Sequence, residues 1–175
     1  MGDLKGKTVL MVIASKEFRD EEYQKPRAVL ESAGAAVTVA SSSLQESKGM
    51  LGLKVKPDIL LKDARMEEYD AVVFVGGMGA TEYWRDPVAH ALVKKAYDSG
   101  KVTAAICLAP MTLANAGLLR GRKATIWPDV AGDFKTKGVV YTGSPVERDG
   151  KIITGSGPDA AEAFGNALVE ALGKG

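Results

Sequence analysis

The chain has 175 residues, of which 46% are hydrophobic and 26% are charged, and its net charge is +1. This length favours one domain, residues 1–175, with a core that needs neither metal nor disulfide. The near-neutral charge argues against a nucleic-acid partner. A single cysteine and a single histidine exclude an internal disulfide and a zinc site of several Cys and His ligands, so we predict no metal and no cofactor.

The sequence also argues against membrane insertion and secretion. No apolar run approaches the roughly 20 residues that a membrane span requires. Residues 1–7 lack the charged start, apolar stretch and small-residue cleavage site of a secretory signal, and Gly6 stands where a myristoylation signal requires Ser or Thr. We therefore predict a cytoplasmic protein with no membrane partner.

Strand-like and helix-like segments alternate along the chain. In order, the sequence predicts strand 8–14, helix 21–33, strand 36–40, short strands and loops over 42–65, strand 71–75, helix 87–99, strand 102–106, helix 109–116, a hairpin over 146–153 and helix 158–172. Apolar residues fill the strands without strict alternation, which is typical of strands buried on both faces. The pattern predicts an α/β fold: a three-layer sandwich with a mostly parallel, flavodoxin-like sheet, helices on both faces and a small C-terminal β-hairpin.

The only cysteine, Cys107, stands where a buried strand ends and a helix begins. Ala105 and Ala109 lie two positions to either side, which is the small-x-nucleophile-x-small spacing of a nucleophile elbow. The helix N-terminus at this position favours a thiolate, so we expect a lowered pKa for Cys107. The alternative is a buried cysteine that only fills space, as free cysteines often do.

A glycine-rich turn follows the strand 71–75. The G-G-x-G spacing of Gly76, Gly77 and Gly79 differs from the G-x-G-x-x-G dinucleotide fingerprint, and no acidic residue follows at the required distance. We therefore favour a turn whose backbone N–H groups hold an oxyanion. A tight turn without a chemical role is the alternative.

An acidic segment, residues 17–22, follows the first strand. Acids at a helix start are usually solvated and stabilised by the helix dipole. However, ligands of open α/β sheets bind outside the carboxyl ends of the strands, where this segment, the glycine turn and Cys107 all lie. The three could converge on one pocket that Trp127 walls, although the residues alone do not identify which acid points into it. His90 lies on a different helix, where a flank position is a better interpretation than a general base.

Together, these motifs resemble the ThiJ/PfpI superfamily over nearly the whole chain. The similarity rests on Phe18-x-Asp20-x-Glu22 with Pro26 beyond it, Val75-Gly76-Gly77, Ala104-Ala105-Ile106-Cys107 and the closing Ile153-Thr154-Gly155-Ser156-Gly157-Pro158. The resemblance implies a class I glutamine amidotransferase-like fold and a homodimer or hexamer. It also implies that Cys107 is a low-pKa thiol, that Glu22 is the acid that hydrogen-bonds it, and that the turn of Gly76 and Gly77, together with Leu108, supplies oxyanion N–H groups.

The sequence departs from the family in its histidines. Family members often carry His directly after the cysteine, or before the proline that here follows Trp127, whereas this chain has Leu108 and Trp127 at those places. Only His90 remains, and it would have to enter the site across a subunit interface. Proteolysis needs a general acid for its amine leaving group and is therefore the least favoured activity.

The resemblance implies three functional hypotheses. In the first, Cys107 attacks a small reactive carbonyl such as methylglyoxal, or its adduct on protein, as a glyoxalase or deglycase, and Glu22 moves the proton. In the second, Cys107 is a redox sensor whose sulfinic acid Glu22 stabilises. In the third, the protein is a PfpI-like intracellular cysteine peptidase or another hydrolase.

Overall fold

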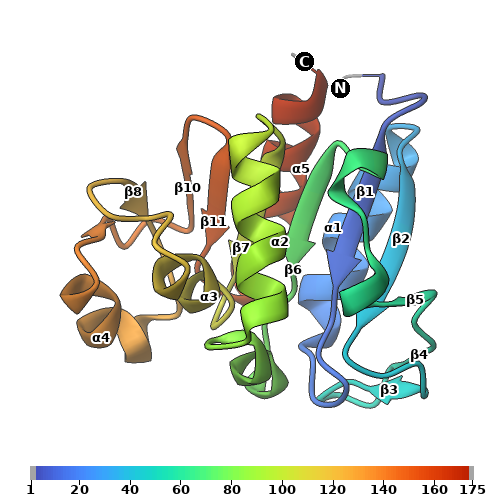
Figure 1. The fold of residues 1–175 in the computed structure, drawn as a ribbon, viewed down its shortest axis with the longest axis horizontal. Helices are drawn as coiled ribbons and strands as arrows, with labels where there is room; N and C mark the ends of the chain where they lie inside the picture. Colours follow the sequence, from blue (N-terminus) through green and yellow to red (C-terminus); the bar gives the residue numbers. More distant parts are fainter. Residues whose placement is uncertain (1–2, 174–175) are drawn as a thin grey trace.

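A seven-stranded sheet lies at the centre of this computed structural model, which describes residues 3–173 (Figure 1). Its strands are β1 (Thr8–Val12), β2 (Ala36–Ser41), β5 (Ile59–Leu60), β6 (Ala71–Phe74), β7 (Val102–Ile106), β10 (Val146–Asp149) and β11 (Ile152–Gly155). They are ordered β10-β11-β7-β6-β1-β2-β5. All neighbouring pairs are parallel except β10 and β11, which form the predicted antiparallel hairpin.

Helices cover both faces of the sheet, so the predicted three-layer α/β fold is confirmed (Figure 1). On one face, α1 (Asp20–Ser32) packs against α5 (Ala161–Gly173), and on the other α2 (Pro87–Asp98) packs against α3 (Pro110–Asn115). Every residue of β6 and β7 is buried, as the unbroken apolar runs predicted. The Asp86 side chain caps α2 by accepting a hydrogen bond from the backbone N–H of Val88 (3.1 Å), and Pro87 occupies the first turn.

Smaller elements fill the connections. The segment 42–65 contains the short strands β3 (Ser47–Lys48), β4 (Lys54–Val55) and β5, together with the 3₁₀ turn η1 (Leu61–Asp63), as predicted. The remaining short elements are η2 (Met66–Glu68), η3 (Met78–Tyr83), β8 (Lys123–Ala124), η4 (Pro128–Val130), α4 (Ala131–Thr136), β9 (Val140–Tyr141) and η5 (Pro158–Ala160). Of these, β8 and β9 pair with each other, beside the main sheet.

The chain reverses its direction of winding between β1 and β6. After β1 it passes through α1 to β2, and after β6 it passes through α2 to β7, on the opposite side of the sheet. Val12 of β1 is aligned with Phe74 of β6, so the two strands end at the same edge. Such a switch point leaves a crevice at the carboxyl ends of the strands, which is where ligands of open α/β sheets bind.

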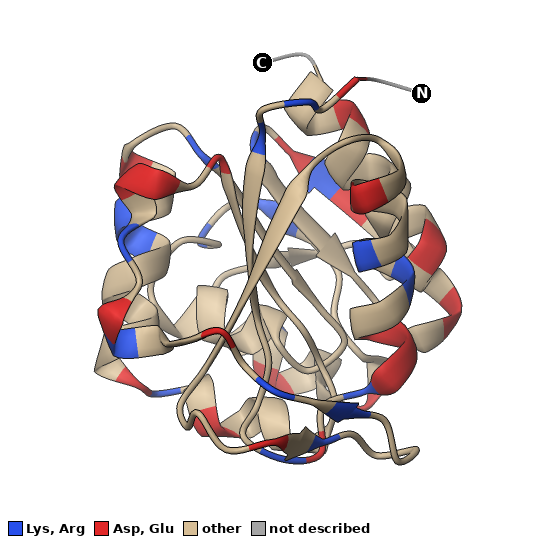
Figure 2. Ribbon diagram, turned by 90° about the vertical axis from the view of Figure 1, so that its right-hand side faces the viewer, with Lys and Arg blue, Asp and Glu red and all other residues tan. Residues whose placement is uncertain are grey.

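Charged residues of both signs are interspersed over the helices and loops, whereas the central strands carry few (Figure 2). This distribution agrees with the net charge of +1. No helix within residues 3–173 is long and apolar enough to cross a membrane.

Candidate active site

Cys107 lies at the sharp turn between β7 and α3. Its φ is 65°, and Glu17 is the only other non-glycine residue with a positive φ among the described residues. A left-handed conformation costs a side chain roughly 1–2 kcal/mol, so the surroundings must hold it. The Cys107 N–H donates to the Gly155 carbonyl, and its own carbonyl accepts from the Trp127 N–H, both at 2.9 Å. Neighbouring segments therefore fix the nucleophile elbow from both sides.

The thiol opens into a small apolar pocket of about 130 Å³. The lining residues are Arg19, Met50, Gly77, Met78, Cys107, Leu108, Trp127 and Pro158. The structure thus places Gly77, Leu108 and Trp127 beside Cys107, as we expected. Arg19 and Met78 belong to the acidic segment and the glycine turn, which we expected to converge here, although neither side chain was singled out. Met50 and Pro158 were not expected at the site, because only long-range folding brings their segments there.

Backbone hydrogen bonds join the turns that meet at this pocket. The Arg19 N–H donates to the Gly76 carbonyl (2.9 Å), and the Gly79 N–H donates to the Glu17 carbonyl (3.0 Å). The β3–β4 connection is tied in by a bond from the Met50 N–H to the Phe18 carbonyl (2.9 Å). The acidic turn, the glycine turn and the β3–β4 connection therefore form one connected unit at the edge of the sheet where ligands of such folds bind.

Glu22 is the acid of the N-terminal segment that reaches the thiol. It lies in the first turn of α1 and is fully buried. Asp20 is also buried, but its carboxylate accepts the N–H groups of Leu51 (3.1 Å) and Leu53 (2.9 Å), so it holds the β3–β4 connection in place. Glu17 is exposed, and Glu21 pairs with Arg19. Of the four acids in this segment, only Glu22 therefore lies at the thiol.

Burial raises the pKa of Glu22 from its ordinary value of 4.5 to about 8. Neither carboxyl oxygen has a well-aligned hydrogen-bond partner among the described residues. The Cys107 thiol and the Gly76 N–H are close enough to lower this pKa, but they do not offset burial. At neutral pH Glu22 is therefore a neutral acid that can donate its proton to the sulfur.

The expected lowering of the Cys107 pKa is wrong. Burial, followed by the charge of Glu22, raises the pKa of Cys107 from 9.0 to about 12. The N–H groups of Gly77 and Leu108 do favour the thiolate, as expected, but they are outweighed. The sequence shows the donors at the elbow and does not show how completely the fold removes the sulfur from water.

Glu22 and Cys107 titrate as a pair, because the Cys107 thiol lowers the pKa of Glu22 whereas Glu22 raises the pKa of Cys107. The charge of an ionised Glu22 contributes to the high pKa of Cys107. While Glu22 keeps its proton, below about pH 8, that repulsion is absent. Below this pH the Cys107 thiol therefore faces a neutral carboxyl group and not a carboxylate.

Gly76 allows this close approach because it has no side chain. A Cβ at this position would overlap the Glu22 carboxyl, the Cys107 Cβ and the Ile106 carbonyl oxygen. Gly77 combines a similar lack of space with a φ of 104°, where side chains are strained. The glycine turn therefore has a steric role at the thiol, and its N–H groups face Glu22 and Cys107.

We expect Gly76→Ala to lower the free energy of unfolding by about 1–3 kcal/mol and to suppress any chemistry of Cys107, since overpacking must displace the pair. Urea unfolding and the rate of Cys107 alkylation measure the two effects. Gly132→Ala is the matched control, because a Cβ there meets no atom within 4 Å. Equal stability and alkylation in the two variants would contradict this prediction.

His90 does not face the pocket. Its Nε2 lies 2.9 Å from the Trp84 carbonyl oxygen, which also accepts a bond from Asn115 Nδ2 (2.8 Å). The Trp84 indole N–H in turn donates to the Leu108 carbonyl (2.8 Å). Within its own chain, His90 thus supports the loop behind the elbow. No group of three or more metal-binding side chains lies together within residues 3–173.

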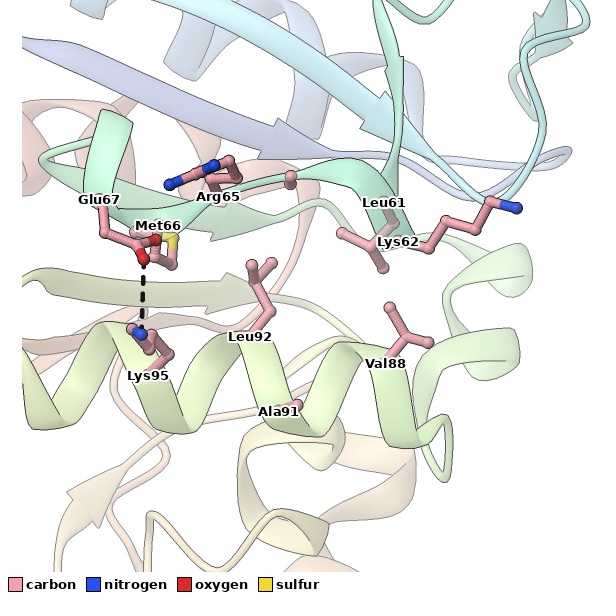
Figure 3. Close-up of a pocket in the computed structure, with 10 residues that line it drawn as sticks. Leu61, Lys62, Arg65, Met66, Glu67, Val88, Ala91, Leu92 and Lys95 are labelled. Carbon is pink, nitrogen blue, oxygen red and sulfur yellow. Dashed lines mark ion pairs between the residues drawn. The ribbon is translucent and has the colours of Figure 1, made fainter.

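A larger groove of about 430 Å³ lies elsewhere, between the η1–η2 segment and α2 (Figure 3). Leu61, Met66 and Leu92 line it, and an ion pair between Glu67 and Lys95 (3.5 Å) spans it. It shares no lining residue with the thiol pocket. Its Glu67 and Lys95 pair with each other, and it contains neither the cysteine nor the buried Glu22, so we do not take it as the candidate active site.

Comparisons with known proteins agree with this geometry. The sequence model of the DJ-1/PfpI family matches residues 7–171. An uncharacterized protein of Methanocaldococcus jannaschii is 43% identical, over 98% of this chain and 85% of its own. A deglycase of Pyrococcus horikoshii is 31% identical, over 93% of this chain and 98% of its own. The crystal structure of a ThiJ/PfpI domain protein from Brachyspira murdochii matches with a TM-score of 0.94 and 31% identity, over 97% of this chain and 98% of that one.

Proposed function

Because the chain belongs to the DJ-1/PfpI family, we propose that it is a cysteine-dependent enzyme that removes reactive carbonyls, as a glyoxalase or a protein deglycase. The observation that carries this proposal is that Cys107, which lines an apolar pocket, lies beside the fully buried acid Glu22. The relative from Pyrococcus horikoshii that is named a deglycase supports the same class of reaction.

The pair supplies the groups that this chemistry needs. With methylglyoxal, the Cys107 thiol releases its proton to solvent and its Sγ forms a bond to the aldehyde carbon, while the C=O π electrons move to the oxygen, which takes the proton of Glu22. The Glu22 carboxylate then removes the proton from that carbon and returns it to the neighbouring carbon, while the hydroxyl proton passes to the neighbouring oxygen. These two proton shifts convert the hemithioacetal into a lactoyl thioester. Water cleaves the thioester, releases lactate and restores the thiol, so the balance needs no oxidant. The N–H groups of Gly77 and Leu108 lie near the sulfur, and in this proposal they stabilise the oxyanions.

The test is methylglyoxal consumption without added glutathione, with lactate measured as the product. We expect the native protein to form lactate, and protein whose Cys107 is first blocked with iodoacetamide to form none above the buffer rate. Equal rates for the blocked and unblocked protein, or no lactate from either, would contradict the proposal.

A redox role is the second candidate, and the neutral Glu22 beside the sulfur favours it. A protonated carboxyl can donate a hydrogen bond to an oxygen of a Cys107 sulfinate and so stop oxidation at that stage. We expect mild peroxide to add two oxygens to the Cys107 peptide of the native protein, detected by mass spectrometry. In Glu22→Asp, whose shorter acid reaches the sulfur less well, we expect more of the three-oxygen product. A thiol that stays unoxidised would contradict this role.

A further inference from the structure

Arg19 is the only charged side chain among the described residues that line the thiol pocket. It immediately precedes α1, and about 29% of its side chain is exposed. The rest of the lining is apolar or backbone. A positive charge in a mostly apolar wall is unfavourable unless it is paired, because removing a charge from water costs free energy.

Glu21 accepts hydrogen bonds from one edge of the Arg19 guanidinium. Arg19 Nε lies 2.8 Å from Glu21 Oε1, and Nη2 lies 3.2 Å from Oε2. This two-point contact fixes the plane of the guanidinium. It leaves Nη1, which has no hydrogen-bond partner among the described residues. Glu21 therefore orients the guanidinium without using all of its donors.

The positive charge of Arg19 interacts electrostatically with Glu22 and Cys107. The negative charges of Glu22 and Cys107 both help to raise the pKa of Arg19, after the contribution of Glu21. Arg19 in turn lowers the pKa of Glu22. The positive charge thus lies near enough to the sulfur to interact with a ligand that occupies the pocket beside it.

We propose that Arg19 is a specificity-determining residue that binds the carboxylate of an anionic carbonyl substrate while its carbonyl carbon faces Cys107 Sγ. This inference rests on the proposed function and narrows its substrate class to α-oxoaldehydes that carry a carboxylate. The apolar wall strengthens the pairing because it excludes water from the contact. Glu21 offsets part of the positive charge, so the preference for an anion is moderate.

Alkylation of Cys107 tests this subsite without any turnover. The probes are iodoacetate, which is anionic, and iodoacetamide, which is neutral and of similar size. A change in the intrinsic reactivity of the thiol affects both alkylation rates equally, so it does not change the ratio of the iodoacetate rate to the iodoacetamide rate. In Arg19→Gln we expect the iodoacetate-to-iodoacetamide ratio to fall roughly tenfold, and in Arg19→Lys to fall less, because the charge remains but the two-point contact is lost.

Arg27→Gln is the matched control, because it removes the same charge at a residue within α1 that pairs with Glu31 and does not line the pocket. We expect it to keep the ratio of the native protein. A ratio in Arg19→Gln equal to that of the native protein would overturn the proposal, and so would an equal fall in Arg27→Gln.

Turnover gives the second measurement, with γ,δ-dioxovalerate as the anionic substrate and methylglyoxal as the neutral one. We expect Arg19→Gln to lower kcat/KM more for γ,δ-dioxovalerate than for methylglyoxal. An equal loss for both would overturn the assignment of specificity to Arg19. If the native protein turns over neither compound, the proposed function fails, while the alkylation ratio still decides whether Arg19 binds anions beside Cys107.

Discussion

Cys107→Ser is expected to reduce methylglyoxal turnover by about a thousandfold or more, the scale seen when a nucleophile is removed. A serine hydroxyl is intrinsically far less acidic than a thiol. Burial and the charge of Glu22, which raise the pKa of Cys107 to about 12, act on a hydroxyl at this position as well. The elbow would therefore keep its shape but present a group that stays neutral. Steady-state rates of lactate formation measure the loss.

Cys107→Ala separates the role of the sulfur from any weak activity of the hydroxyl. We expect the two variants to be equally inactive, since neither can form the bond to the aldehyde carbon. Thermal unfolding must show that both are folded, because the backbone at this position is held at a φ of 65°. Turnover at the native rate by either folded variant would remove Cys107 from the mechanism.

The sequence predicts the central strands and main helices well, because their signals are local. Strands such as β6 and β7 are buried on both faces, so their apolar runs are a direct consequence of their place in the sheet. The strand β9 has only two residues and carries no periodicity. It is therefore found only in the structure.

In the candidate site, too, the residues in local motifs could be predicted, whereas those brought together by tertiary folding could not. Cys107 stands out because an elbow is a local motif, with small residues at fixed positions. Met50 does not, because it reaches the pocket only after the β3–β4 connection folds over the start of α1 and Asp20 holds it there. Arg19 lies in the acidic segment that the sequence predicts near the pocket, but nothing local shows that its side chain lines the wall. The direction of the thiol pKa also depends on tertiary burial, which no short segment encodes.

Glu22→Gln is expected to make the protein more stable than the native form at neutral and alkaline pH. The unfolded chain releases the proton of Glu22 near pH 4.5, whereas the folded protein keeps it to about pH 8. Between these values the folded state binds the proton more tightly, so the stability of the native protein falls as the pH rises. Between pH 4.5 and 8 the free energy of unfolding of the native protein falls by about 5 kcal/mol. A glutamine at this position does not titrate, so it makes no such contribution to the pH dependence of stability.

The measurement is the free energy of unfolding of both proteins from urea curves between pH 4.5 and 8, below the ordinary titration of the thiol. The difference in the free energy of unfolding, variant minus native, should grow with pH throughout this range. Glu21→Gln is the control, because Arg19 lowers the pKa of Glu21 and reverses the sign of its pH dependence. A difference between Glu22→Gln and the native protein that stays constant with pH would mean that Glu22 is ionised in the folded state. It would then have no proton to donate to the substrate, and the proton transfer proposed for the first step would fail with it.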